Sequence, residues 1–322
     1  MGNARLEDLL GDSSSYTAMT DKEKDYFVKL LQEEMQRRED SGRVEQVRDI
    51  VRIEDWINSD YYVGSDQKNI YPYWKDFIVD IFRDTRKDGE KINSVILSGS
   101  IGVGKSTVAE LIMMRKMYEL SCFRNINAMF DLMSKTNIMF LYFSVNQKQA
   151  ERTGFGEYRA LIDNSPYFNE NFQRNPRLNS LLVFPEGISY AYGSSASDSI
   201  GMSVICSMLD EANFLGGNGP SKDSEKATDL YANIVNRSNS RFIVDGGINH
   251  SLNILVSSAT YENSATERQI RLSRNDPHTI VAAPAQWDVK PKNFSKKFFY
   301  VFKGSNYLEA NIVNSTDDVN NY

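Results

Sequence analysis

The sequence has little of the chemistry that stabilises small secreted or metal-bound folds. It contains two cysteines, Cys122 and Cys206, and two histidines among 322 residues. Both cysteines lie in apolar surroundings, so we expect a reducing compartment and no disulfide framework. The histidines and cysteines are too scattered to supply the ligand spacing of a structural zinc site, and we expect none.

Long apolar runs and targeting signals are also missing. No stretch of about 18 consecutive apolar residues exists, so we expect no membrane span. The first residues lack the basic and then apolar pattern of a secretory signal, and Leu6 stands where a myristoylation signal needs Ser or Thr. The net charge of −6 argues against a uniformly basic nucleic-acid surface. A local stripe of Lys and Arg would still be enough to bind nucleic acid.

What the sequence does have is a glycine-rich segment between an apolar run and a helical pattern. Residues 94–110 read SVILSGSIGVGKSTVAE, which contains the P-loop pattern Gly-x-x-x-x-Gly-Lys-Ser in its strand–loop–helix context. Glycines let backbone N–H groups turn toward phosphate oxygens, and the following helix points its positive end at the same place. We therefore predict a nucleotide site that includes Gly99, Ser100, Gly102, Val103, Gly104, Lys105, Ser106 and Thr107.

A second segment supplies carboxylates of the kind that such a site needs. The mostly apolar run 203–209 ends in Asp210 and Glu211, which is a Walker B arrangement. We predict that Lys105 reaches the β- and γ-phosphates of ATP, while Ser106 and Asp210 hold Mg²⁺. Glu211 is predicted to polarise the attacking water as a general base. Surface carboxylates at a strand end are the alternative interpretation.

Two further segments have both a functional and a structural interpretation. Residues 252–260 read LNILVSSAT, and the hydroxyls of Ser258 and Thr260 could bind and release the γ-phosphate or its attacking water. An ordinary strand end capped by hydroxyls would look the same. Gln67, Tyr71 and Tyr73 are candidates for holding adenine, whereas core packing for Trp74 and ordinary surface for the others is an equal alternative.

The periodicity of the remaining sequence predicts an α/β organisation. A capping box at residues 20–23 begins a helix to about Glu39, and a second helical stretch covers residues 44–57. A helical region is expected from the P-loop to Met133, then a buried strand at 138–145 and a β-hairpin of 181–184 with 188–192. A further strand is expected at 280–287. We divide the chain into a helical segment or lid (1–60), a P-loop ATPase core (61–290) and a C-terminal extension (291–322).

Taken together, these segments resemble the ATPase domain of large terminases, the motors that package DNA into the capsids of tailed bacteriophages. The similar stretches follow the family's order from Tyr71 to Pro291. They are GSIGVGKST, FSVNQKQAERTGF, NSPYF, VICSMLDEANF, LVSSAT and WDVKP.

The resemblance implies a RecA-like P-loop NTPase fold with a mainly parallel sheet, of the ASCE class, in which a catalytic glutamate follows the Walker B aspartate. It assigns Lys105, Ser106, Asp210 and Glu211 the roles given above, and it makes Ser258 and Thr260 the coupling motif. It further implies ATP and Mg²⁺ as cofactors and double-stranded DNA, a portal protein and a small terminase subunit as partners. The active form would be a homo-oligomeric ring, usually a pentamer, in the host cytoplasm and transiently at the procapsid portal vertex.

The sequence departs from the family in two respects. Many members carry an arginine in or beside the P-loop, but here the variable positions are Ser, Ile, Gly and Val. An arginine finger must then come from elsewhere, and Arg152, Arg159, Arg237 and Arg241 are candidates, acting in the same chain or on a neighbouring subunit's ATP. Members normally continue into a nuclease domain, whereas we expect no further strands after Pro291 and no nuclease activity.

Two alternative functions remain open. One is a helicase-like DNA-dependent ATPase, although the residues after Trp287 are too few for a second RecA-like lobe. The other is a non-hydrolysing, nucleotide-gated assembly module, against which the intact Lys105 and Glu211 speak.

Overall fold

The structure is a computed structural model of the whole chain. It describes residues 19–313 except for 42–43, 84–90, 135, 145–147, 149, 179, 194–201, 215–219, 245–246, 260–263, 296, 298, 303 and 305–308. Thr260, predicted as part of the coupling motif, lies outside the described residues.

A seven-stranded sheet in the order β11-β2-β10-β7-β4-β6-β5 forms the centre of the molecule. The strands are β2 (Ser94–Leu97), β4 (Ile138–Phe143), β5 (Leu182–Val183), β6 (Ile188–Gly193), β7 (Ser203–Leu209), β10 (Leu252–Val256) and β11 (Thr279–Ala282). Neighbouring strands run parallel except β5 and β6, which form the predicted hairpin. Every residue of β4, β6, β7 and β10 is buried, as expected for a parallel sheet covered on both faces. The predicted α/β P-loop fold with a mainly parallel sheet is confirmed.

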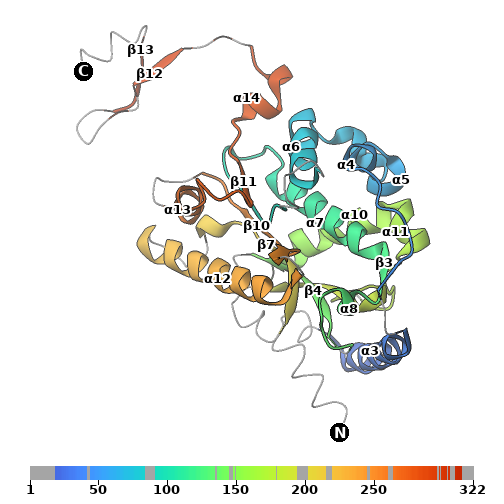
Figure 1. Cartoon of the computed structure of the whole chain (residues 1–322). Coiled ribbons are helices and arrows are strands. Elements are labelled where there is room, and N and C mark those ends of the chain that lie inside the picture. Colours follow the sequence, from blue (N-terminus) through green and yellow to red (C-terminus); the bar gives the residue numbers. More distant parts are fainter. Residues whose placement is uncertain are drawn as a thin grey trace.

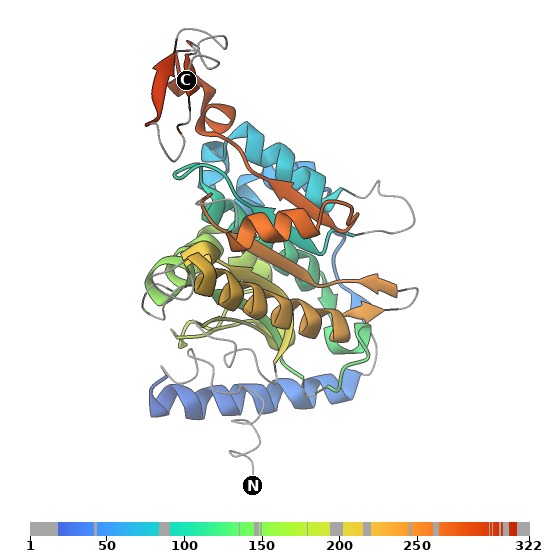
Figure 2. The same ribbon diagram turned by 90° about the vertical axis from the view of Figure 1, so that its left-hand side faces the viewer.

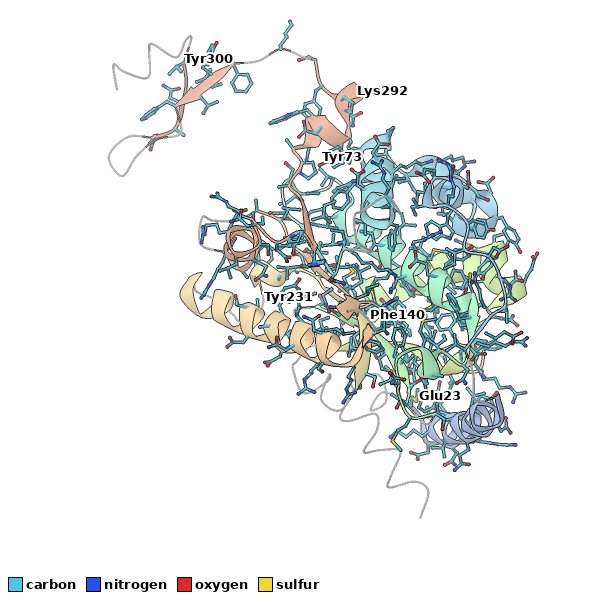
Figure 3. All side chains as sticks on the ribbon, in the orientation of Figure 1. Glu23, Tyr73, Phe140, Tyr231, Lys292 and Tyr300 are labelled. Carbon is cyan, nitrogen blue, oxygen red and sulfur yellow. The ribbon has the colours of Figure 1, made fainter. Side chains whose placement is uncertain are left out.

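Helices cover both faces of this sheet (Figure 1). One face carries α4 (Ile53–Ile57), α6 (Pro72–Phe82), α7 (Lys105–Ser121), α10 (Gly156–Asn164) and α11 (Pro166–Asn171), and the other carries α12 (Pro220–Arg241) and α13 (Ala265–Leu272). Successive strand residues alternate between the two sides. Tyr142 and Met208 belong to the core under α7, whereas Phe143 and Leu209 belong to the core under α12. Phe140, labelled in Figure 3, lies at the centre of the sheet.

The N-terminal helix α3 (Asp21–Ser41) begins at the predicted capping box. The Thr20 amide donates to the Glu23 carboxylate at 2.9 Å, and the Glu23 amide donates to the Thr20 hydroxyl at 3.4 Å. Phe27 is fully buried in the same core as Phe143 and Leu209. Helix α3 also contacts η4 (Pro185–Gly187) in the β5–β6 turn. Figure 2 shows α3 along the bottom of the molecule, at the end of the sheet opposite β11 and β2. A lid function for residues 1–60 stays a prediction.

Two predicted helices are wrong in extent. Within residues 44–57, Glu45–Gln46 form strand β1 and only α4 is helical. The segment is held extended on α7, because the Val51 amide donates to the Tyr118 hydroxyl and the Arg115 guanidinium donates to the Val51 carbonyl. Likewise α7 ends at Ser121, and the chain continues as β3 (Phe123–Arg124), which pairs with β1, and as α8 (Ile126–Met129). These tertiary contacts override the local helical pattern.

The region after the sheet also differs from prediction. The strand predicted at 280–287 ends at Ala282 because Pro284 follows shortly, and α14 (Gln286–Val289) comes next. Strands β12 (Tyr300–Phe302) and β13 (Asn311–Val313) pair antiparallel, so the expectation of no strands after Pro291 is wrong. Tyr300 lies on this hairpin, which stands apart from the body (Figure 3). The remaining short elements are α5 (Asp60–Val63), η1 (Ser65–Asn69), η3 (Ala150–Phe155), η6 (Ala212–Phe214), β8 (Ile243–Val244), β9 (Ile248–Asn249) and η8 (Pro291–Asn293).

Candidate functional site

The predicted P-loop connects β2 to α7 with three glycines in the left-handed region. Gly99, Gly102 and Gly104 have φ angles of 89°, 75° and 88°, which other residues adopt only at a cost. A Cβ on Gly99 would also collide with the Pro284 carbonyl. The loop therefore needs glycine for its conformation, and it opens onto the N-terminus of α7, where anions bind well.

Lys105 is the first residue of α7 and is 7% exposed. Its Nζ donates to the Ser100 carbonyl at 2.6 Å and to the Ser258 hydroxyl at 3.3 Å. Burial lowers the pKa of Lys105, while the charges of Glu211 and Asp210 act in the opposite direction. The ammonium thus lies between the P-loop, the end of β10 and the carboxylates after β7.

The order of the strands explains this convergence. Strand β10 lies between β2 and β7, so the carboxyl ends of all three meet at one edge of the sheet. The Ser257 amide donates to the Leu97 carbonyl at 3.0 Å, and the Asp210 amide donates to the Phe143 carbonyl of β4 at 2.8 Å. The P-loop, the hydroxyls after β10 and the carboxylates after β7 are therefore neighbours.

Asp210 is 6% exposed and is fixed through both carboxylate oxygens. Oδ1 accepts the Glu211 amide at 2.9 Å, and Oδ2 accepts the Tyr142 hydroxyl at 3.0 Å. Burial raises the pKa of Asp210, and the hydrogen bonds from Glu211, Tyr142 and Ser106 oppose that rise. The Ser106 hydroxyl and the Asp210 carboxylate face each other across a hydrogen bond, and both are the hard oxygen ligands that Mg²⁺ prefers. These residues fit a Mg²⁺ ion.

Glu211 adopts a φ of 53°, which is unusual for a residue with a side chain. Backbone strain of this kind is concentrated at functional sites. The side chain is partly buried, and burial followed by the charge of Asp210 raises the pKa of Glu211, against the opposing charge of Lys105. A raised carboxyl pKa suits a general base that works near neutral pH.

Asn213 is a site residue that the sequence did not reveal. Its backbone N–H donates to the Ser257 hydroxyl at 3.1 Å, and its side-chain Nδ2 donates to the Ser258 carbonyl at 2.8 Å. Its side-chain oxygen accepts the Thr266 amide of α13 at 3.0 Å. Asn213 therefore connects the segment after Glu211 to the end of β10 and to α13. A single Asn in a short polar segment gives no distinctive pattern.

The outer side of the P-loop is also held by side chains. The Trp74 indole N–H donates to the Val103 carbonyl at 2.6 Å, and Trp74 is 1% exposed, so its core interpretation holds. Gln286 Nε2 donates to the Ile101 carbonyl at 2.9 Å, and Lys290 Nζ donates to the Gly102 carbonyl at 2.5 Å. The α14 segment thus supports the loop, which the sequence did not predict.

The adenine candidates lie at different distances from the loop. Tyr71 is 39% exposed, and Lys290 Nζ, which donates to the Gly102 carbonyl, is 5.5 Å from the centroid of its ring, which places Tyr71 beside the P-loop. Tyr73 of α6 lies near α14 (Figure 3), where burial and the Asp288 charge raise its pKa. Gln67 Oε1 accepts a hydrogen bond from Lys75 at 3.2 Å. A role of Gln67 and Tyr71 in binding adenine stays a prediction.

The arginine candidates differ in position. Arg152 is exposed on η3, a π-helical turn that packs against Tyr142 through Gly154, at the same edge as Asp210. Arg241 donates to the Ser203 hydroxyl at 2.7 Å, at the start of β7. The length of β7 separates that position from Asp210 by about 20 Å. Arg241 therefore does not reach the site of its own chain.

Comparison with known proteins agrees with the P-loop architecture. Residues 23–312 match the family described as "Uncharacterized protein MJ0330, N-terminal P-loop domain". The chain belongs to this family. No curated protein matches the chain. Within the part of the chain that the structure describes, no helix combines the length and apolar character needed to cross a membrane.

Several solved structures are similar to the chain at low identity. The large terminase of bacteriophage HK97 is 18% identical, with a TM-score of 0.48 over 72% of this chain and 43% of that protein. The large terminase of a thermophilic bacteriophage, in complex with ATP-gamma-S, is 11% identical, with a TM-score of 0.44 over 70% of this chain and 47% of that protein. The ATPase domain of the Thermus phage P74-26 large terminase is 18% identical, with a TM-score of 0.37 over 67% of this chain and 82% of that domain. The chain therefore spans less than half of the first two proteins.

Proposed function

We propose that this domain hydrolyses ATP with Mg²⁺ and uses the reaction to move double-stranded DNA, as the motor part of a large-terminase-type packaging assembly. The observation that carries the hydrolysis is the convergence of Lys105, Ser106, Asp210 and Glu211 at one edge of the sheet. The DNA-packaging part is supported by the terminase-like motifs, which occur in the family's order along the sequence.

Each residue has a defined task in the proposed reaction. Lys105 binds the β- and γ-phosphates, and the loop amides orient them for in-line attack. Ser106 and Asp210 would hold the metal ion, which would supply positive charge to the phosphate oxygens. Glu211 accepts the proton of the attacking water. An arginine, with Arg152 as the candidate at this edge, would stabilise the transferring group, in its own site or in that of a neighbouring subunit.

The hydrogen bonds of Asn213 offer a route from hydrolysis to movement. Ser258 contacts Lys105 on one side and Asn213 on the other, and Asn213 contacts Thr266 of α13. Loss of the γ-phosphate would change the partners of Ser258 and so shift α13. In this proposal DNA is held through its backbone, so its affinity falls steeply with salt and shows no sequence preference.

The test measures Mg²⁺-dependent ATP turnover against enzyme concentration, with duplex DNA, with single-stranded DNA and without DNA. We expect duplex DNA to stimulate turnover more than single-stranded DNA, and turnover per subunit to rise with concentration as a neighbour completes the site. Preferential stimulation by single-stranded DNA would instead support the helicase-like ATPase. Nucleotide binding without turnover under every condition would support the assembly module and contradict the proposal.

A further inference from the structure

The buried hydroxyl of Tyr142 contacts the carboxylate that we assign to the metal. Tyr142 lies on β4, next to β7, and is 1% exposed. Its hydroxyl donates to Asp210 Oδ2 at 3.0 Å, while the Glu211 amide occupies Oδ1. Burial, together with the charge of Asp210, raises the pKa of Tyr142. Apart from Ser106, the other proposed metal ligand, the groups that orient the carboxylate are one from β4 and one from its own loop.

The Tyr142 ring packs against a π-helical turn. This turn, η3, covers Ala150–Phe155, and the ring lies against Gly154. A Cβ on Gly154 would overlap the outer carbons of the ring, including the carbon that bears the hydroxyl. Gly154 is buried and its backbone is not in the left-handed region, so closeness to Tyr142 rather than backbone conformation requires glycine here. Turns of this type occur often at functional sites.

We propose that Tyr142 is a positioning residue for the metal-binding carboxylate, and that Gly154 is the position on η3 that allows it to act. The proposal rests on the proposed Mg²⁺–ATP function. Mg²⁺ demands near-ideal octahedral geometry, so a carboxylate free to rotate binds it less well. Partners that orient a metal ligand typically change metal affinity by about 10- to 100-fold when they are removed.

The chain offers matched controls for both substitutions. Tyr190 is a buried tyrosine on β6, in the same sheet, and its hydroxyl has no hydrogen-bond partner among the described residues. Tyr190→Phe therefore removes the same atom as Tyr142→Phe without touching Asp210. Gly156 lies two residues after Gly154, and a Cβ there would meet only the Glu151 carbonyl, at 3.9 Å. Gly156→Ala therefore adds the same methyl group without displacing the ring.

The experiment measures the binding of Mn²⁺, as a probe for Mg²⁺, in the presence of ADP by electron paramagnetic resonance. Metal-free ADP binding and the thermal unfolding midpoint are measured alongside. We expect Tyr142→Phe and Gly154→Ala to weaken Mn²⁺ binding by about tenfold or more, with metal-free ADP binding unchanged. The controls Tyr190→Phe and Gly156→Ala should bind Mn²⁺ like the wild type.

A double variant separates positioning from general damage. If Gly154 acts through the Tyr142 hydroxyl, Gly154→Ala added to Tyr142→Phe weakens Mn²⁺ binding no further, because the hydroxyl is already gone. Additive losses would overturn the role of Gly154. Wild-type Mn²⁺ binding in Tyr142→Phe would overturn the proposal and leave the proposed function standing, whereas absence of Mn²⁺–ADP binding in the wild type would refute both. If Gly154→Ala fails to fold, the tyrosine pair still decides the role of Tyr142.

Discussion

At the carboxyl edge of the sheet, Asp210 is 6% exposed and both of its carboxylate oxygens accept hydrogen bonds. One turn of α7 beyond Ser106, Glu110 is 1% exposed, and its Oε1 has no hydrogen-bond partner among the described residues. Burial raises the pKa of both carboxyl groups, and for Glu110 the rise is large, with added contributions from Glu157 and Asp210. At the edge of the sheet, the buried Asp210 carboxylate is therefore stabilised by hydrogen bonds. In the layer beneath it, which is the buried part of α7, the Glu110 carboxyl group is costly to ionise. Substitutions at the edge should mainly affect chemistry, and those beneath it should mainly affect stability.

The largest expected effect of this contrast is at Lys105. Lys105→Ala should lower ATP turnover by at least about 10²- to 10³-fold, because it removes the cation that binds the phosphates. The unfolding temperature should change little, because the burial that lowers the pKa of Lys105 opposes the attraction of its charge to Asp210 and Glu211. Turnover and thermal unfolding measured on the same sample check this. A large loss of stability would show that the edge serves folding instead.

Asn213 is the residue at which we expect a substitution to affect both ATP turnover and stability. Asn213→Ala removes its side-chain bonds to the partly buried Ser258 carbonyl and to the buried Thr266 amide, at a cost of about 1–3 kcal/mol. We expect turnover and the free energy of unfolding to fall together. Asn169→Ala is the control, since its side chain makes one exposed hydrogen bond to the Asp163 carbonyl. Normal turnover in Asn213→Ala would remove the proposed coupling route.

A substitution at Tyr71 tests whether the site also binds the adenine base of the nucleotide. If adenine stacks on this ring, Tyr71→Ala should raise the KM for ATP by about tenfold, because aromatic stacking of a base contributes about 1–3 kcal/mol. The kcat should stay the same, since the ring does not touch the phosphates. Tyr61→Ala, at a similarly exposed tyrosine on α5, serves as the control. An unchanged KM would show that Tyr71 does not bind adenine and is an ordinary surface residue.

The smallest expected effect is a gain of stability at Glu110. The folded-state pKa of Glu110 lies above its unfolded value, so the folded state holds the extra proton between these values, and stability falls as pH rises through that window. Glu110→Gln is neutral at every pH and should unfold at a higher temperature at pH 8, on the order of 2 °C. The difference should vanish below about pH 4. Turnover should be unchanged, and a variant less stable than wild type at pH 8 would contradict the account of this layer.

The sequence was informative where a short segment carries its own geometry. The P-loop glycines, the capping box at Thr20 and the apolar runs of β4 and β7 were predictable, because backbone conformation and burial follow from the local pattern. The strand order was not predictable from spacing alone, although it is what brings Ser258 beside Lys105.

The residues that were missed act through tertiary contacts. Tyr142 reads as one more apolar residue of a buried strand, and its contact with Asp210 depends on the pairing of β4 with β7. Lys290 contacts Gly102, although 188 positions separate the two residues in the sequence. The helix predicted at 44–57 failed for the same reason, because Tyr118 and Arg115 of α7 hold Val51 extended. A pattern within one segment does not contain such contacts.

Glu211 gives the most direct test of the central claim that this edge is built for hydrolysis. The measurement compares ATP affinity and Mg²⁺-dependent turnover in the wild type and in Glu211→Gln. The account predicts that the variant binds ATP like the wild type and loses turnover by about 10²- to 10⁴-fold, because only the group that accepts the proton of water is removed. Wild-type turnover in Glu211→Gln would contradict the assignment of the general base and, with it, the proposed reaction at this edge.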